Sequence, residues 1–153
     1  MIHFKGIPSF SPEIFKELVN TDPMKTKQLE KGIRQLTEEG VAQLFTVHTT
    51  QAKIIGTVGD LQFEVIQYRL LHEYGASCQF KPLQYYKASW LTSGNSQKLN
   101  EFIRTKSNYI AYDKDENPVF LASSEWILRL TQQDYPDIQF HLTSEFNKDE
   151  VII

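Results

Sequence analysis

The chain has 153 residues, a length that suits one domain or two small lobes rather than a large multidomain enzyme. Its 41% hydrophobic and 12% aromatic content argues against disorder, and its net charge of −3 argues against a dedicated nucleic-acid binder, although not against a local basic patch. The single cysteine excludes an internal disulfide and a cysteine-based zinc site. The same cysteine usage is typical of a reducing cytosol, so we expect a cytoplasmic protein. No stretch approaches the roughly 20 apolar residues of a membrane span, so we expect no membrane partner.

The first half of the chain predicts a ferredoxin-like lobe. Asp22 and Pro23 suit the cap and first turn of a helix, and Gly40 and Gly75 are typical helix ends. Elements are expected over 4–10 (strand), 22–40 (helix), 42–48 and 53–58 (strands), 60–74 (helix) and 77–83 (strand). This order, β-α-β-β-α-β, is that of a ferredoxin-like α+β arrangement.

The second half predicts a smaller lobe, a mixed sheet with two helices. Elements are expected over 85–91 (strand), from 94–96 onward (helix), 109–112 and 119–122 (hairpin), after Ser123 or Ser124 (helix) and 138–142 (strand). In the last helix Trp126, Ile127 and Leu130 are expected to face inward. The domain then covers residues 1–146, with lobes at about 7–83 and 84–146 and a flexible tail over 147–153.

The helix expected over 60–74 carries apolar residues on two sides. One side holds Phe63, Ile66, Leu70 and Tyr74, and the nearly opposite side holds Leu61, Val65 and Tyr68. A helix that is apolar on two sides needs a cover on both. We therefore expect a sheet beneath this helix and either the second lobe or a partner above it.

Three cations form the most suggestive charge pattern. Lys27, Lys31 and Arg34 lie on one helix face, opposite the apolar stripe, at a spacing that could follow the phosphates of a folded RNA. An ordinary solvated helix face is the alternative, and nearby Glu30 dilutes the positive potential.

The sequence offers no catalytic, cofactor-binding or metal-binding residues. No histidine has a partner at a metal-ligand spacing, and the chain has neither a phosphate-binding loop nor a Gly-x-Ser-x-Gly nucleophile elbow. A second binding function stays open, because Tyr85, Tyr86 and Trp90 on a strand could stack bases in a free-standing ferredoxin-like RNA-binding module. Core packing is the alternative for these aromatic residues.

Four segments, in the same order along the chain, resemble a known family. They are residues 6–13 (GIPSFSPE), 25–40 (KTKQLEKGIRQLTEEG), 56–65 (GTVGDLQFEV) and 128–141 (LRLTQQDYPDIQFH). Segments 25–40 and 56–65 together resemble the third domain of translational GTPases, and most closely that of the bacterial release factor 3 family. Segments 6–13 and 128–141 also resemble the C-terminal domain of that family. Elongation factor G, a related family, has a His where this chain has Gln62.

The resemblance implies a role in translation termination. The family is a GTPase that promotes recycling of codon-reading release factors, and its C-terminal domain contacts the ribosome. GTP or GDP and magnesium would bind an N-terminal GTPase domain absent from this chain, so this stretch is expected to be non-catalytic and to hold no cofactor. Expected partners are ribosomal RNA and protein and the GTPase domain of the same parent chain, with the fragment a monomer. Lys27, Lys31 and Arg34 become candidate ribosome contacts, and Leu61, Val65 and Tyr68 would join the lobes.

Overall fold

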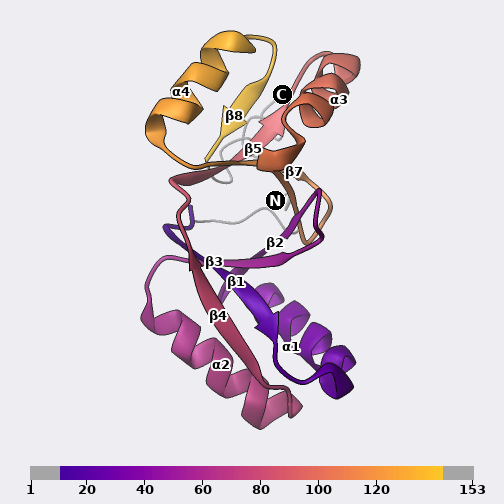
Figure 1. Ribbon diagram of the computed structural model, residues 1–153, viewed down its shortest axis with the longest axis vertical. Coiled ribbons are helices and arrows are strands. Elements are labelled where there is room, and N and C mark those ends of the chain that lie inside the picture. The colour runs from indigo at the N-terminus through magenta and orange to yellow at the C-terminus, as the bar shows by residue number, and fades with distance from the viewer. Residues whose placement is uncertain (1–10, 143–153) are drawn as a thin grey trace, which may run out of the picture.

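The computed structural model describes residues 11–142, so the strand expected over 4–10 and the tail expected over 147–153 lie outside the described residues. Two helices lie at each end of the long axis, and the strands lie between the two pairs (Figure 1). The α+β class is therefore confirmed.

The first lobe has the predicted ferredoxin-like topology. Its elements are β1 (Ile14–Asn20), the short 3₁₀ helix η1 (Pro23–Lys25), α1 (Thr26–Glu38), β2 (Gln43–Val47), β3 (Lys53–Thr57), α2 (Leu61–Tyr74) and β4 (Cys78–Leu83). The strands stand in the order β4-β1-β3-β2, and each neighbouring pair is antiparallel. The place of the first strand in this sheet is taken by β1, which lies later in the chain than the range expected from the sequence.

The second lobe repeats that topology. Its elements are β5 (Lys87–Thr92), α3 (Ser96–Thr105), the short 3₁₀ helix η2 (Ser107–Tyr109), β6 (Ile110–Asp113), β7 (Pro118–Ala122), α4 (Glu125–Asp134) and β8 (Gln139–His141). The strands stand in the order β6-β7-β5-β8. When each strand is numbered by its place within its own unit, this is the first lobe's order reversed. The sequence predicts a mixed sheet here, whereas the described strand pairs are all antiparallel. Each lobe is therefore a β-α-β-β-α-β unit.

The two sheets join through equivalent strands. The second strand of each unit, β2 and β6, pairs antiparallel, with Phe45 opposite Asp113 and Val47 opposite Ala111. This pairing produces one eight-stranded sheet with an approximate twofold relation between its halves.

Three apolar clusters explain why the sheet bends back on itself. The outer clusters lie between each helix pair and its half-sheet, and the central cluster lies between the two helix-free sheet faces. Side chains alternate between them along a strand: Ile55 belongs to the first-lobe cluster and its neighbour Ile54 to the central one. The central cluster consists of Phe15, Phe45, Ile54, Ala88, Trp90, Ala111, Val119 and Leu121. The result is a helix–sheet–sheet–helix arrangement in which the lobes meet through their strands (Figure 1).

The inward face predicted for α4 is wrong in part. Trp126 and Leu130 are exposed, at 66% and 38%, while Leu128 and Thr131 are buried. The helix is therefore rotated about its axis relative to the predicted orientation. The buried Thr131 hydroxyl has a hydrogen-bond partner, because it donates to the Ile127 carbonyl at 2.7 Å.

Candidate interaction surfaces

Local sequence signals fix the position of α1. The Asp22 carboxylate accepts a hydrogen bond from the Met24 backbone N–H at 3.1 Å and so caps the turn that leads into the helix. Leu29, Ile33 and Leu36 then pack against the sheet as predicted. The opposite face of the helix consequently points to solvent.

The basic face consists of Lys27, Lys31 and Arg34, and all three residues are exposed on α1. None of these side chains makes a hydrogen bond or an ion pair with another residue of the described range 11–142. Their charges therefore remain available to an external anion. Glu30 and Glu38, also exposed, lower the local positive potential without neutralising it.

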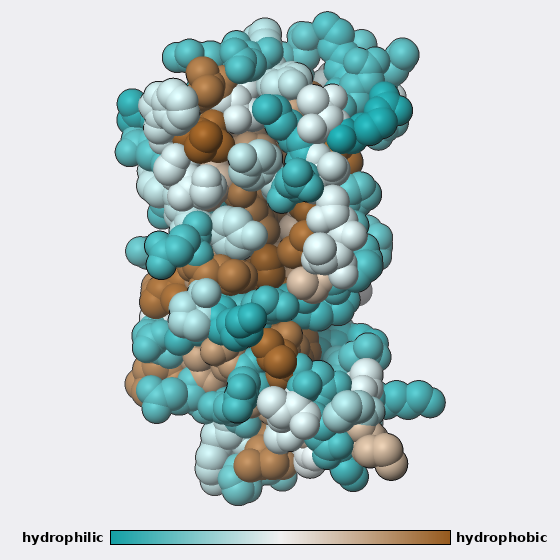
Figure 2. Space-filling view, viewed as in Figure 1, coloured by the Kyte–Doolittle hydropathy of each residue, from teal (hydrophilic) through white to brown (hydrophobic). Residues whose placement is uncertain are grey.

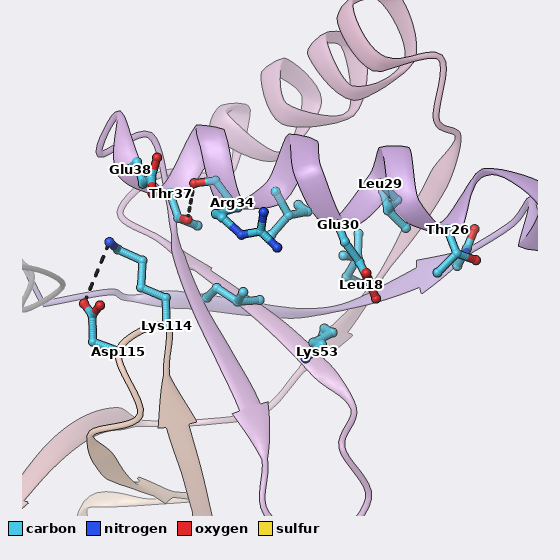
Figure 3. Close-up of a pocket in the computed structure, with 13 residues that line it drawn as sticks. Leu18, Thr26, Leu29, Glu30, Arg34, Thr37, Glu38, Lys53, Lys114 and Asp115 are labelled. Atoms are coloured by element: carbon cyan, nitrogen blue, oxygen red, sulfur yellow. Dashed lines mark hydrogen bonds and ion pairs between the residues drawn. The ribbon is translucent and has the colours of Figure 1, made fainter.

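A groove of about 370 Å³ runs along one flank of α1. Its apolar lining comes from Leu18, Leu29, Ile33 and Leu44. In Figure 3, Arg34 and Glu30 project from α1 on one side, and Lys114 and Asp115 stand on the β6–β7 hairpin across from the helix.

The charges at this groove are partly paired. Lys114 lies 3.8 Å from Asp115, and the Lys53 ammonium donates to the Thr46 hydroxyl at 3.1 Å. Arg34 thus extends the basic face toward a groove whose rim carries both signs of charge. This arrangement, an apolar floor with charged residues at its rim, is typical of a binding surface.

A second surface runs along α2. The α2 apolar stripe consists of Leu61, Val65, Tyr68 and Leu71, whose exposed fractions are 67%, 43%, 63% and 50%. Figure 2 shows hydrophobic side chains reaching the surface among hydrophilic ones in the lower part of the molecule, where Figure 1 places α2.

The prediction that Leu61, Val65 and Tyr68 join the lobes is wrong. The lobes meet through the helix-free faces of their sheets, so the outer side of α2 faces away from the second lobe. The prediction that α2 is covered from below is confirmed, since Phe63, Ile66 and Leu70 are buried against the sheet. That a partner covers the outer side of α2 stays a prediction.

The residue before α2, Asp60, is of a type that commonly caps a helix, and the sequence predicts that it caps this one. Asp60 makes no capping hydrogen bond and instead pairs with Lys16 at 2.8 Å. The Gln62 side-chain oxygen accepts from the Gly59 N–H at 2.7 Å. The end of the helix is as predicted, because Gly75 adopts a left-handed conformation with φ of 67°.

An exposed ion cluster and a close contact between Gly32 and side chains of α2 hold α1 and α2 together. The Arg69 guanidinium donates to Glu39 and to Glu73, at 2.7 Å in each case. These hydrogen bonds hold the pKa of both carboxyls below their usual value near 4.5 and raise the pKa of Arg69. Beneath the cluster, Gly32 lies so close to Leu70 that a Cβ at position 32 would stand 2.6 Å from its Cδ2.

The predicted aromatic stacking surface does not form. Trp90 is 1% exposed, and its indole N–H donates to the buried Asp113 carboxylate at 3.0 Å. Tyr85 packs edge-on against Phe15, with ring centroids 5.8 Å apart, inside the region between the sheets. The helix-free sheet face that an RNA-binding module would use is thus covered by the other half of the sheet.

No group of three or more His, Cys, Asp or Glu side chains within residues 11–142 is placed to hold a metal ion. No helix in the same range is long and apolar enough to cross a bilayer. Cys78 is buried, and this burial raises the pKa of its thiol to about 11.

Comparison with known proteins identifies the family. The family model described as "Class II release factor RF3, C-terminal domain" matches residues 4–132. The chain belongs to the release factor 3 family. Two curated relatives, both peptide chain release factor 3, come from Nitrosomonas europaea and Nitrosomonas eutropha and are 41% and 40% identical over 144 residues. The resemblance predicted from the four sequence segments is confirmed.

This stretch corresponds to part of its release factor 3 relatives. The match covers 94% of this chain but 27% of each relative. A crystal structure from Thermus thermophilus is similar at a TM-score of 0.43 and 21% identity, over 60% of this chain and 14% of that one.

Proposed function

We propose that this chain acts as the C-terminal, ribosome-contacting domain of a translation-termination GTPase that promotes recycling of codon-reading release factors. Membership of the release factor 3 family supports the assignment to termination. In such a parent, an N-terminal domain would bind GTP or GDP with magnesium and carry out hydrolysis in the cytoplasm. The stretch described here would then supply contacts to the ribosome.

The observation that carries the ribosome contact is the basic face of α1. Three exposed cations without partners among the described residues share one helix face, on a chain whose overall net charge is negative. An acidic protein gains affinity for RNA only where its cations are concentrated, since binding depends on displacing counterions from phosphates. Lys27, Lys31 and Arg34 are therefore the proposed contacts to ribosomal RNA, with acidic ribosomal protein surface as a further partner.

The experiment uses a chimera, because the chain spans only part of its relatives. The chimera carries this chain in place of the matching stretch of the Nitrosomonas europaea release factor 3. Lys27→Glu and Lys31→Glu are introduced together, and sedimentation with bacterial ribosomes is measured over a series of salt concentrations. A matched control reverses the same number of charges elsewhere, at exposed Lys81 and Arg104.

Loss of two phosphate contacts should lower the slope of log affinity against log salt by roughly 1.5 and weaken binding at least about tenfold. The control pair should leave the slope unchanged. Equal effects of the two pairs would show that binding depends on the overall charge of the protein and not on a contact face. An unchanged slope of log affinity against log salt in the Lys27→Glu and Lys31→Glu variant would refute the assignment of these residues.

A further inference from the structure

The α2 apolar stripe has the features of a protein-docking surface. Four large apolar side chains stand exposed along one side of a regular fourteen-residue helix. The Tyr68 ring packs against the His72 ring, with centroids 4.1 Å apart. This contact restrains the Tyr68 side chain at the centre of the stripe. Single exposed apolar residues are ordinary on a protein surface, but a continuous row of them on one helix marks an interaction site.

The charges around the stripe disfavour RNA as its occupant. Glu64 is exposed beside it, Asp60 lies at its start, and Glu73 stands on the flank that faces α1. Of these acids, Asp60 is neutralised by Lys16, and Arg69 is shared between Glu73 and Glu39. The local surface is therefore apolar with a weakly acidic border, in contrast to the basic face on α1. A phosphate backbone would be repelled here, whereas an apolar protein surface would fit.

The size of the stripe distinguishes between possible protein occupants. A stable complex of separate chains buries roughly 800 Å² on each partner, which four side chains on one helix do not supply. A contact within one polypeptide needs far less area, because the connecting chain already holds the two surfaces at a high effective concentration. The release factor 3 relatives have such a connection available, since this stretch matches 27% of their length.

We propose that the α2 apolar stripe docks against another domain of the longer release factor 3 polypeptide, through an apolar patch on that domain. The inference rests on the proposed function, in that it takes this chain to work as one domain of a longer parent. It assigns the two helices of the first lobe different partners. RNA contacts belong to α1, and α2 attaches the domain to the rest of its own chain.

A thiol reporter tests the proposal. Val65→Cys places a thiol within the stripe, and Gln97→Cys places a control thiol on exposed α3 of the second lobe. Each substitution is made in the 153-residue chain and in the chimera with the Nitrosomonas europaea protein. Alkylation by a maleimide, without ribosomes, is followed by peptide mass spectrometry at that one position. Cys78 gives no interfering signal, because it is buried and its thiol pKa is raised to about 11.

Docking should slow alkylation at position 65 at least about tenfold in the chimera relative to the isolated chain, the protection that about 1.4 kcal/mol provides. Position 97 should react equally in both proteins. Adding Leu61→Asp and Tyr68→Asp to the reporter chimera should restore the fast rate. Equal rates at position 65 in both proteins would overturn the proposal. Protection in the isolated chain that grows with its concentration would also overturn it, since the occupant would then be a second copy. Because ribosomes are absent, either result leaves the test of the α1 basic face independent.

Discussion

Replacing Gly32 by Ala tests whether α1 and α2 depend on a close backbone approach. The added Cβ would stand 2.6 Å from Leu70 Cδ2 and 2.9 Å from Tyr74 Cδ2. The first distance is about 1 Å shorter than ordinary carbon–carbon contact. Leu70 is fully buried, so its side chain has little room to rotate away, and we expect the added methyl group to push the two helices apart.

Two opposing effects set the size of the change. Alanine is favoured over glycine inside a helix by about 1 kcal/mol. Overpacking a tight contact costs about 1–3 kcal/mol, and two neighbouring side chains are affected here, which places the cost near the upper end. Separation of the helices would also stretch the Arg69 bridge to Glu39. We expect a net loss of about 2 kcal/mol in the free energy of unfolding.

Urea unfolding followed by circular dichroism provides the assay. Gly94→Ala is the matched control, because Gly94 has no neighbour within 4 Å of a built Cβ, and its change should stay within about 0.5 kcal/mol. A Gly32→Ala protein as stable as the parent chain, or more stable, at an unchanged slope of free energy against urea would refute the reasoning.

Two further predictions concern polar groups. The pKa values of Glu39 and Glu73 are lowered by hydrogen bonds from Arg69, so their contribution to stability is present above pH of about 4.5 and is lost as the pH falls further. Thermal unfolding at pH 7 and at acid pH should therefore differ less in Arg69→Gln than in the parent chain; an equal difference would contradict the role of the cluster. Trp90→Phe removes the donor to the buried Asp113 carboxylate and should cost about 2 kcal/mol in urea unfolding, because hydrogen bonds to charged groups contribute about 1.5–3 kcal/mol. The Asp113 carboxylate also accepts from the Asp115 and Asn117 backbone N–H groups and from the Asn117 side-chain amide. A loss below about 0.5 kcal/mol would show that these donors suffice.

Helix boundaries were the most predictable part of the fold, because they depend on local chemistry. The side chains of Asp22, Asn95 and Ser124 accept hydrogen bonds from backbone N–H groups in the first turns that they precede. Gly75 ends its helix in the left-handed conformation that glycine adopts without strain. These signals lie within a few residues of the structure that they determine.

The environment of each helix face was less predictable, because it depends on distant parts of the chain. The apolar residues on the outer side of α2 suggested a covering lobe, and the aromatic residues near Trp90 suggested an open sheet face. The β2–β6 pairing reverses both expectations, since it turns the helix-free faces toward each other and leaves α2 outside. Nothing local to β2 or β6 indicates which strand is its partner.

The repeated topology was also invisible in the sequence. The first-lobe helices have 13 and 14 residues, whereas the second-lobe helices have 10 each, so the corresponding elements do not recur at a fixed interval.

The basic face of α1 was found from spacing alone, and the structure adds that its three cations have no partner among residues 11–142.

The central cluster bears on how the chain is made. When synthesis has reached β4, the first half-sheet is complete in sequence, yet Phe15, Phe45 and Ile54 still lack the side chains of β5 and β7 that cover them. The outer edge of β2 likewise stays unpaired until β6 emerges. A nascent chain stopped there would carry a bare apolar face and an open strand edge, both of which promote aggregation. The two topological repeats are therefore not separable products, and a break between them would yield insoluble halves instead of two smaller domains.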